Sequence, residues 1–127
     1  MNFFSQMGLV MLGGALGSGA RFATYKLFEH WQFHTAAATL TVNIVGSFLI
    51  TMVAEMYGAS HLHANTRLFV NMGIMGGLTT YSSFNHVVVE LIEHKHYSTA
   101  ALNIVLTVLL CLAAGFGGLY CGRLLGK

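Results

Sequence analysis

Glycine, hydroxyl and aromatic residues follow one another in one apolar stretch of the chain, a composition that could bind an ion. The segment reads GIMGGLTTYSSFN over residues 73–85. A straight helix over 67–93 would be about 40 Å long, which exceeds the hydrocarbon core of a bilayer. The paired glycines and the polar run after them predict a helix broken near 76–82, where unwound carbonyls commonly hold a cation. The alternative is an intact helix whose hydroxyls bond back to their own carbonyls.

Asn43 and Arg21 are the other polar side chains whose positions could carry chemistry. Asn43 is expected near the middle of an apolar helix, where a carboxamide needs hydrogen-bond partners. It could join two helices, or it could donate to a ligand in a pathway. Arg21 follows an uncharged stretch by one residue. It could extend to the lipid headgroups, as an arginine near a helix end usually does, or face a water-filled vestibule and attract anions.

The histidines are less informative than these residues. His61 and His63, and likewise His94 and His96, fall in presumed loops at a spacing of two. This spacing does not place two imidazoles on one helix face, so solvent exposure explains them better than a metal site. His86 differs from the others, since it follows the predicted break by a few residues and could line a vestibule.

Uncharged stretches supply the elements that must position these residues. Only 8% of the 127 residues are charged, against about 25% in a soluble domain. Asp, Glu, Lys and Arg are absent from the ranges 1–20, 30–54, 68–89 and 96–122. A helix needs roughly 17–25 apolar residues to cross the hydrocarbon, and each range provides them. The sequence predicts an all-α membrane protein, a single domain over 1–127 with transmembrane helices near 3–27, 35–57, 67–93 and 97–124.

Glycines spaced four apart recur in three of the predicted helices. Small residues at this spacing let helix backbones approach closely in lipid, where packing drives association. The pattern predicts tight helix packing and indicates nothing about function. The glycines concerned are Gly13 and Gly17, Gly73 and Gly77, and Gly118, Gly122 and Gly126.

The basic residues show no bias toward one side of the membrane. With the N-terminus inside, three lie on the cytoplasmic side and three on the other. Orientation normally follows an excess of Lys and Arg in cytoplasmic loops, so an equal count favours a chain that inserts both ways and pairs with its inverted copy. The alternative is a chance tie among few charges. The two groups are Arg67, Arg123 and Lys127, and Arg21, Lys26 and Lys95.

Three segments in order carry a family resemblance: GGALGSGAR over 13–21, TLTVNIVGSF over 39–48 and GGLTTYSSF over 76–84. They resemble the Fluc/CrcB fluoride channels of bacteria. Chain length and the four-helix layout agree, so the resemblance covers essentially the whole chain. It implies an antiparallel, dual-topology homodimer in the bacterial inner membrane, with two fluoride pores and a central structural sodium ion. Such a channel would export fluoride passively from the cytoplasm.

The resemblance also implies roles for particular residues. The backbone carbonyls of Gly76 and Thr79 from both subunits would hold the sodium ion. Tyr81 and Phe84 would supply aromatic rings along the pores, since the positive edge of a ring can face an anion. The remaining pore residues would be Asn43 and Ser83 as hydrogen-bond donors, and Arg21 as the arginine of the family's first helix.

The chain departs from the family pattern at several positions. Tyr81 stands where phenylalanine is usual. The family's Ser-x-Glu after the second aromatic residue is replaced by Asn85-His86-Val87. Polar residues of the fourth helix give way to Cys111 and Gly115, as far as the segments align. These departures bear on the rate of permeation rather than on the fold. A pair of two different chains is an alternative to the homodimer.

A small four-helix multidrug antiporter is the main alternative function. Such a carrier needs a carboxylate within the membrane to exchange protons for cations, whereas the first stretch holds no Asp or Glu and the whole chain no Asp. An enzyme is not expected, because no nucleophile, base and orienting group occur together. Six basic against four acidic residues are too weak a bias to indicate nucleic acid. The expected partners are fluoride, the lipid bilayer and an inverted identical subunit.

Overall fold

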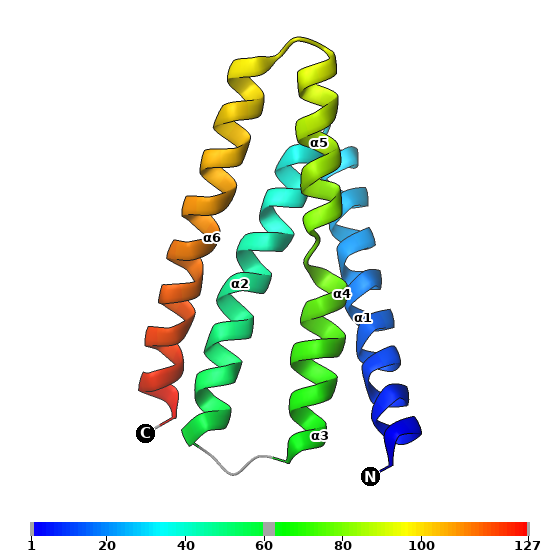
Figure 1. Cartoon of the computed structure of the whole chain (residues 1–127), viewed down its shortest axis with the longest axis vertical. Helices are drawn as coiled ribbons and strands as arrows, with labels where there is room; N and C mark the ends of the chain where they lie inside the picture. Colours follow the sequence, from blue (N-terminus) through cyan, green and yellow to red (C-terminus); the bar gives the residue numbers. More distant parts are fainter. Residues whose placement is uncertain (1, 60–62, 127) are drawn as a thin grey trace.

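The computed structural model describes residues 2–59 and 63–126, and every regular element among them is helical. Four long rods result. The first is α1 (Phe3–His30) and the second α2 (Thr35–Ala59); the third comprises α3 (Ala64–Arg67), the π-helical η1 (Leu68–Met75), α4 (Gly76–Leu78) and α5 (Tyr81–Glu93); the fourth is α6 (Tyr97–Leu125). Figure 1 shows the α5–α6 connection at one end and both termini at the other. The prediction of an all-α chain with four helices is confirmed.

The first rod ends in a tight turn that is rich in aromatic rings. α1 runs to His30 rather than ending near residue 27, and the N–H of Trp31 donates to the carbonyl of Leu27 at 3.2 Å. Gln32 then adopts a positive φ of 57°, which reverses the chain. The ring of Phe28 lies 6.5 Å from that of Trp31, centroid to centroid. Tryptophan at a helix end is typical of a membrane–water interface.

Paired glycines bring α1 against η1 and α4. A methyl group on Gly13 would lie 2.9 Å from the Cα of Gly73, and one on Gly17 would lie 2.8 Å from the amide nitrogen of Leu78. Such separations leave no room for any side chain, so the two backbones are in direct contact. The tight packing predicted from glycines four apart is confirmed for this pair of rods.

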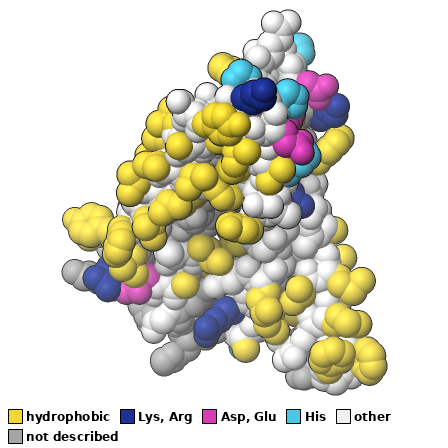
Figure 2. Space-filling model, turned by 45° about the horizontal axis from the view of Figure 1, so that its top comes forward, with side chains coloured by type: hydrophobic (Ala, Val, Ile, Leu, Met, Phe, Trp, Pro, Cys, Tyr) yellow, Lys and Arg dark blue, Asp and Glu magenta, His cyan; other side chains and the backbone are white. Residues whose placement is uncertain are grey.

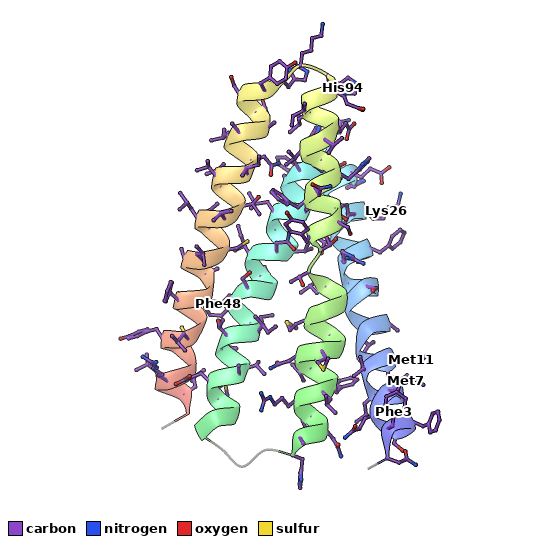
Figure 3. All side chains as sticks on the ribbon, in the orientation of Figure 1. Phe3, Met7, Met11, Lys26, Phe48 and His94 are labelled. Carbon is purple, nitrogen blue, oxygen red and sulfur yellow. The ribbon has the colours of Figure 1, made fainter. Side chains whose placement is uncertain are left out.

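Among single helices of the described residues, α2 and α6 share the most extensive contact. The Thr51 hydroxyl of α2 donates to the Gly115 carbonyl of α6 at 2.7 Å. A methyl group on Gly118 would overlap the carbonyl oxygen of Phe48. The Phe48 side chain, labelled in Figure 3, reaches α6 beside Gly117. Glycine again lets the backbones approach, here with one hydroxyl bridging them.

Much of the apolar surface of α2 and α6 is left uncovered by the chain itself. These two helices, over Thr35–Met56 and Tyr97–Leu125, are long and apolar enough to cross a membrane. Only 22% of the apolar stretch of α2 and 6% of that of α6 is buried. The first and third rods were also expected as spans, but within the described residues neither is both long and apolar enough. The first rod is richer in glycine and polar residues, and the third is interrupted. Lipid or another chain must cover the exposed apolar sides.

Charged and histidine side chains lie toward the ends of the rods in the described part of the chain, Arg21 excepted. Figure 2 shows many of them near the end where α5 meets α6, with smaller charged groups lower in the view. Lys26 pairs with Glu29 at 2.7 Å near the end of α1. His94 and His96 are exposed as expected, and His94 is labelled in Figure 3. The described residues hold no group of three ligating side chains that could bind a metal; His61 lies outside them.

Gly17→Ala is expected to destabilise the protein by about 1–3 kcal/mol, because a methyl group there overlaps the backbone of the third rod. Gly19→Ala on the same helix is the matched control, since nothing lies within 4 Å of a methyl group at that position. It should be neutral or stabilising, because alanine is the better helix former. Thermal unfolding in detergent measures both. Equal loss in the two variants would contradict the glycine contact.

Candidate functional site

The third rod is interrupted at two threonines. α4 ends at Leu78 and α5 begins at Tyr81 (Figure 1). Between them Thr79 (φ −80°, ψ 154°) and Thr80 (φ −154°, ψ 116°) are extended. The Thr80 hydroxyl accepts from the N–H of Ser83 at 3.1 Å and so caps α5, which is the usual role of threonine before a helix. The interruption lies inside the expected interval 76–82.

The carboxamide of Asn43 pairs with both backbone groups of Thr80. Its Oδ1 accepts from the Thr80 N–H at 2.8 Å, and its Nδ2 donates to the Thr80 carbonyl at 3.1 Å. The Thr80 N–H has no helical acceptor at this point, and in an apolar surrounding it needs a partner. The Thr80 carbonyl, at the N-cap of α5, accepts the bond from Asn43 in addition to the first bond of that helix. Asn43 therefore joins α2 to the interruption, as in the first of its two expected roles. These bonds leave the second hydrogen of Nδ2 for another acceptor.

Arg21 reaches the same interruption from α1. Its Nη1 donates to the Thr79 carbonyl at 3.3 Å, and the contact is partly buried. Because α1 continues to His30, Arg21 is not at a helix end. The structure thus replaces the headgroup interpretation of this arginine with a contact at the interruption.

Tyr81 and Phe84 form an aromatic pair in the first turn of α5. Their ring centroids are 5.6 Å apart, with 54° between the ring planes. Both rings line a cavity of about 730 Å³ that α2, the interruption, α5 and α6 enclose, and Asn43 lines it as well. Tyr81 is 78% exposed. One chain therefore forms only part of the wall around these rings.

Ser83 lies outside the cavity lining, whereas Cys111 and Gly115 of the fourth rod, aligned with pore positions in the sequence, line it. The Ser83 hydroxyl accepts from that of Thr80 at 3.1 Å, and the side chain is not among those lining the cavity. Cys111 lines the cavity, and so does Thr107, which the sequence reasoning missed. Thr107 donates to Asn103 at 3.2 Å. The spacing of four from Asn103 through Thr107 to Cys111 marks one helix face and could have revealed this row.

The carbonyls of Gly76 and Thr79 fit a cation. The Gly76 carbonyl would accept from Thr80 in a continuous helix, but that N–H bonds Asn43 instead. Gly76 is exposed, and nothing lies within 4 Å of the place where its side chain would begin. The Thr79 carbonyl has two lone pairs, so the hydrogen bond from Arg21 leaves one for another partner. Unwound carbonyls of this kind coordinate sodium in other membrane proteins.

Comparison with known proteins identifies the family. A family model described as CrcB-like protein, Camphor Resistance (CrcB), matches residues 8–119. The chain belongs to the CrcB family. This confirms the resemblance found in the sequence, and together with the apolar α2 and α6 it makes the CrcB chain a membrane protein.

Relatives of this CrcB chain are similar over most of its length. The "Fluoride-specific ion channel FluC" of Sorangium cellulosum (strain So ce56) is 41% identical over 117 residues, 88% of this chain and 90% of that protein. The protein of the same name from Anaeromyxobacter dehalogenans (strain 2CP-1 / ATCC BAA-258) is 44% identical over 115 residues, 85% of this chain and 87% of that protein. The chain therefore spans most of each relative.

Asn43→Ala is expected to lower the free energy of unfolding of this CrcB chain by about 1–3 kcal/mol, because it leaves the buried N–H of Thr80 without a partner. Thr41→Ala on the same helix is the control. It removes only a hydroxyl that donates to the Ala37 carbonyl at 2.8 Å, and a loss below about 1 kcal/mol is expected. Denaturant unfolding in micelles compares the two variants, and similar losses would show that Asn43 does not hold the interruption.

Proposed function

We propose that the chain is a passive, fluoride-selective ion channel that releases fluoride from the cytoplasm. The names of its CrcB relatives support this function. The observation that carries it in the structure is the interruption held by Asn43, which sets the rings of Tyr81 and Phe84 beside a cavity. Family membership favours a channel over the antiporter alternative and over an enzyme.

The side chains around the cavity suit a small, strongly hydrated anion. A pore for fluoride must replace the water around the ion with hydrogen-bond donors and positive ring edges. The free hydrogen of Asn43 Nδ2 supplies one donor, and the ring edges of Tyr81 and Phe84 supply a weaker attraction. The hydroxyl of Thr107 lines the same cavity and could rotate toward an anion. These groups come from three of the four rods.

We propose that a second, inverted copy of the chain completes the pathway. The exposure of Tyr81, at 78%, and the 6% burial of the apolar stretch of α6 both call for further covering. An inverted arrangement agrees with the equal distribution of basic residues predicted from the sequence. Each subunit would then cross the bacterial inner membrane several times, with the interruption near the midplane and two pores in the dimer.

Gly76 and Thr79 of both subunits would hold a sodium ion at the centre of this dimer. Their carbonyls are among the groups that the interruption removes from helical hydrogen bonding. When bound, the ion supplies a fixed positive charge between the pores and a common ligand for the two subunits. An ion shared in this way stabilises the assembly by mass action, since the separate chains bind it less well.

Liposomes that contain the purified protein are expected to release fluoride rapidly and to retain chloride. A fluoride electrode follows the release, a potassium ionophore clamps the voltage, and chloride-loaded vesicles serve as the control. Release without chloride leakage supports a selective channel. No fluoride release from a folded dimer would contradict the homodimeric channel and favour a pair of different chains.

Phe84→Ile is expected to slow fluoride release at least about tenfold, because the loss of a ring edge costs more than about 1.4 kcal/mol in the pore. Tyr81→Phe should keep the rate within about threefold, since the ring edge remains. Phe22→Ile replaces an exposed ring of α1 that does not line the cavity, and it should behave as the wild type. A rate for Phe84→Ile equal to that of Phe22→Ile would remove the aromatic pair from the pathway.

A further inference from the structure

The Thr79 carbonyl is shared between two positive partners if the proposed sodium site is present. Arg21 donates to this oxygen at 3.3 Å, and a guanidinium stays protonated in proteins. The other lone pair of the oxygen would be the one available to the proposed ion. The guanidinium of Arg21 and the proposed sodium ion would therefore contact the same carbonyl oxygen.

No acidic side chain offsets the charge of Arg21 in the part of the chain that the structure describes. The ion pairs found there join Lys26 to Glu29 and Arg123 to Glu55. The remaining acidic residues, Glu90 and Glu93, are exposed toward the far end of α5. Arg21 is a partly buried cation whose hydrogen bond at the interruption is to a neutral oxygen.

We propose that Arg21 is a positioning residue that lowers the sodium affinity of the interruption, because its positive charge repels the ion and its hydrogen bond uses the same Thr79 carbonyl. The inference rests on the sodium site of the proposed function. Two unit charges about 5 Å apart repel strongly enough, at an effective dielectric constant near 20, to change a binding constant by roughly a few hundredfold. Water and side-chain movement reduce this effect, so about tenfold is expected.

Arg21 has a second effect on the same carbonyl. Its hydrogen bond gives Thr79 a partner before any ion binds, which keeps the extended segment paired in the sodium-free chain. Removing the guanidinium should change both the stability of the sodium-free protein and the sodium concentration that stabilises it. The sodium-free form becomes less stable, and less sodium is needed to stabilise it.

Sodium titrations of thermal stability test the proposal on the purified, full-length protein. Sodium chloride replaces the chloride of an organic cation at constant ionic strength, and the melting temperature is measured at each step. The result is the sodium concentration that gives half of the maximal rise in melting temperature. Arg21→Gln is expected to lower this concentration about tenfold and to lower the melting temperature without sodium. Arg21→Lys keeps the charge and should stay within about threefold of the wild type. Arg67→Gln, an exposed arginine of α3, is the charge-matched control and should leave the concentration unchanged.

Arg21→Met is a second neutral variant, should Arg21→Gln fail to fold, and the same roughly tenfold lower sodium requirement is expected of it. An unchanged or raised sodium requirement in the neutral variant that folds overturns the proposal. A wild type that ignores sodium would instead contradict the sodium site itself.

Discussion

Every backbone polar group at Thr79 and Thr80 needs a partner, and the arrangement of the first three rods follows from how these partners are supplied. Asn43 of α2 satisfies both groups of Thr80, and Arg21 of α1 reaches the carbonyl of Thr79. Two different rods are thereby fixed to one short extended segment. Side chains of this length can reach it only because glycine brings the backbones together, as at Gly17. Close packing and polar pairing thus depend on each other.

The interruption also presents two opposite kinds of polar group within a few residues. The end of α4 leaves carbonyl oxygens without helical donors, and one of them belongs to Gly76, an exposed residue. The start of α5 presents amide hydrogens and the positive end of a helix dipole beside Tyr81. A continuous helix would offer neither group. Groups suited to a cation and groups suited to an anion can therefore lie side by side without any acidic residue between them.

Composition and spacing in the sequence were enough to predict the helical class, the four rods and the glycine contacts. They did not predict the partner of Asn43, because the rotation of α2 about its axis decides which backbone group its carboxamide meets. The role of Arg21 was missed for a related reason: α1 continues to His30, so its end could not be judged from the charge pattern. The π-helical turns of η1 have no signature in residues 68–75 that we recognise.

Trp31 is the single tryptophan of the chain, and it lies 56% exposed in the turn after α1. Each copy of the chain therefore carries one indole fluorophore, near the end of α1. In a pair of inverted subunits the two indoles would lie at opposite faces of the bilayer, whereas parallel subunits would bring them to the same face. The unmodified chain thus contains an optical marker of the direction in which each copy was inserted.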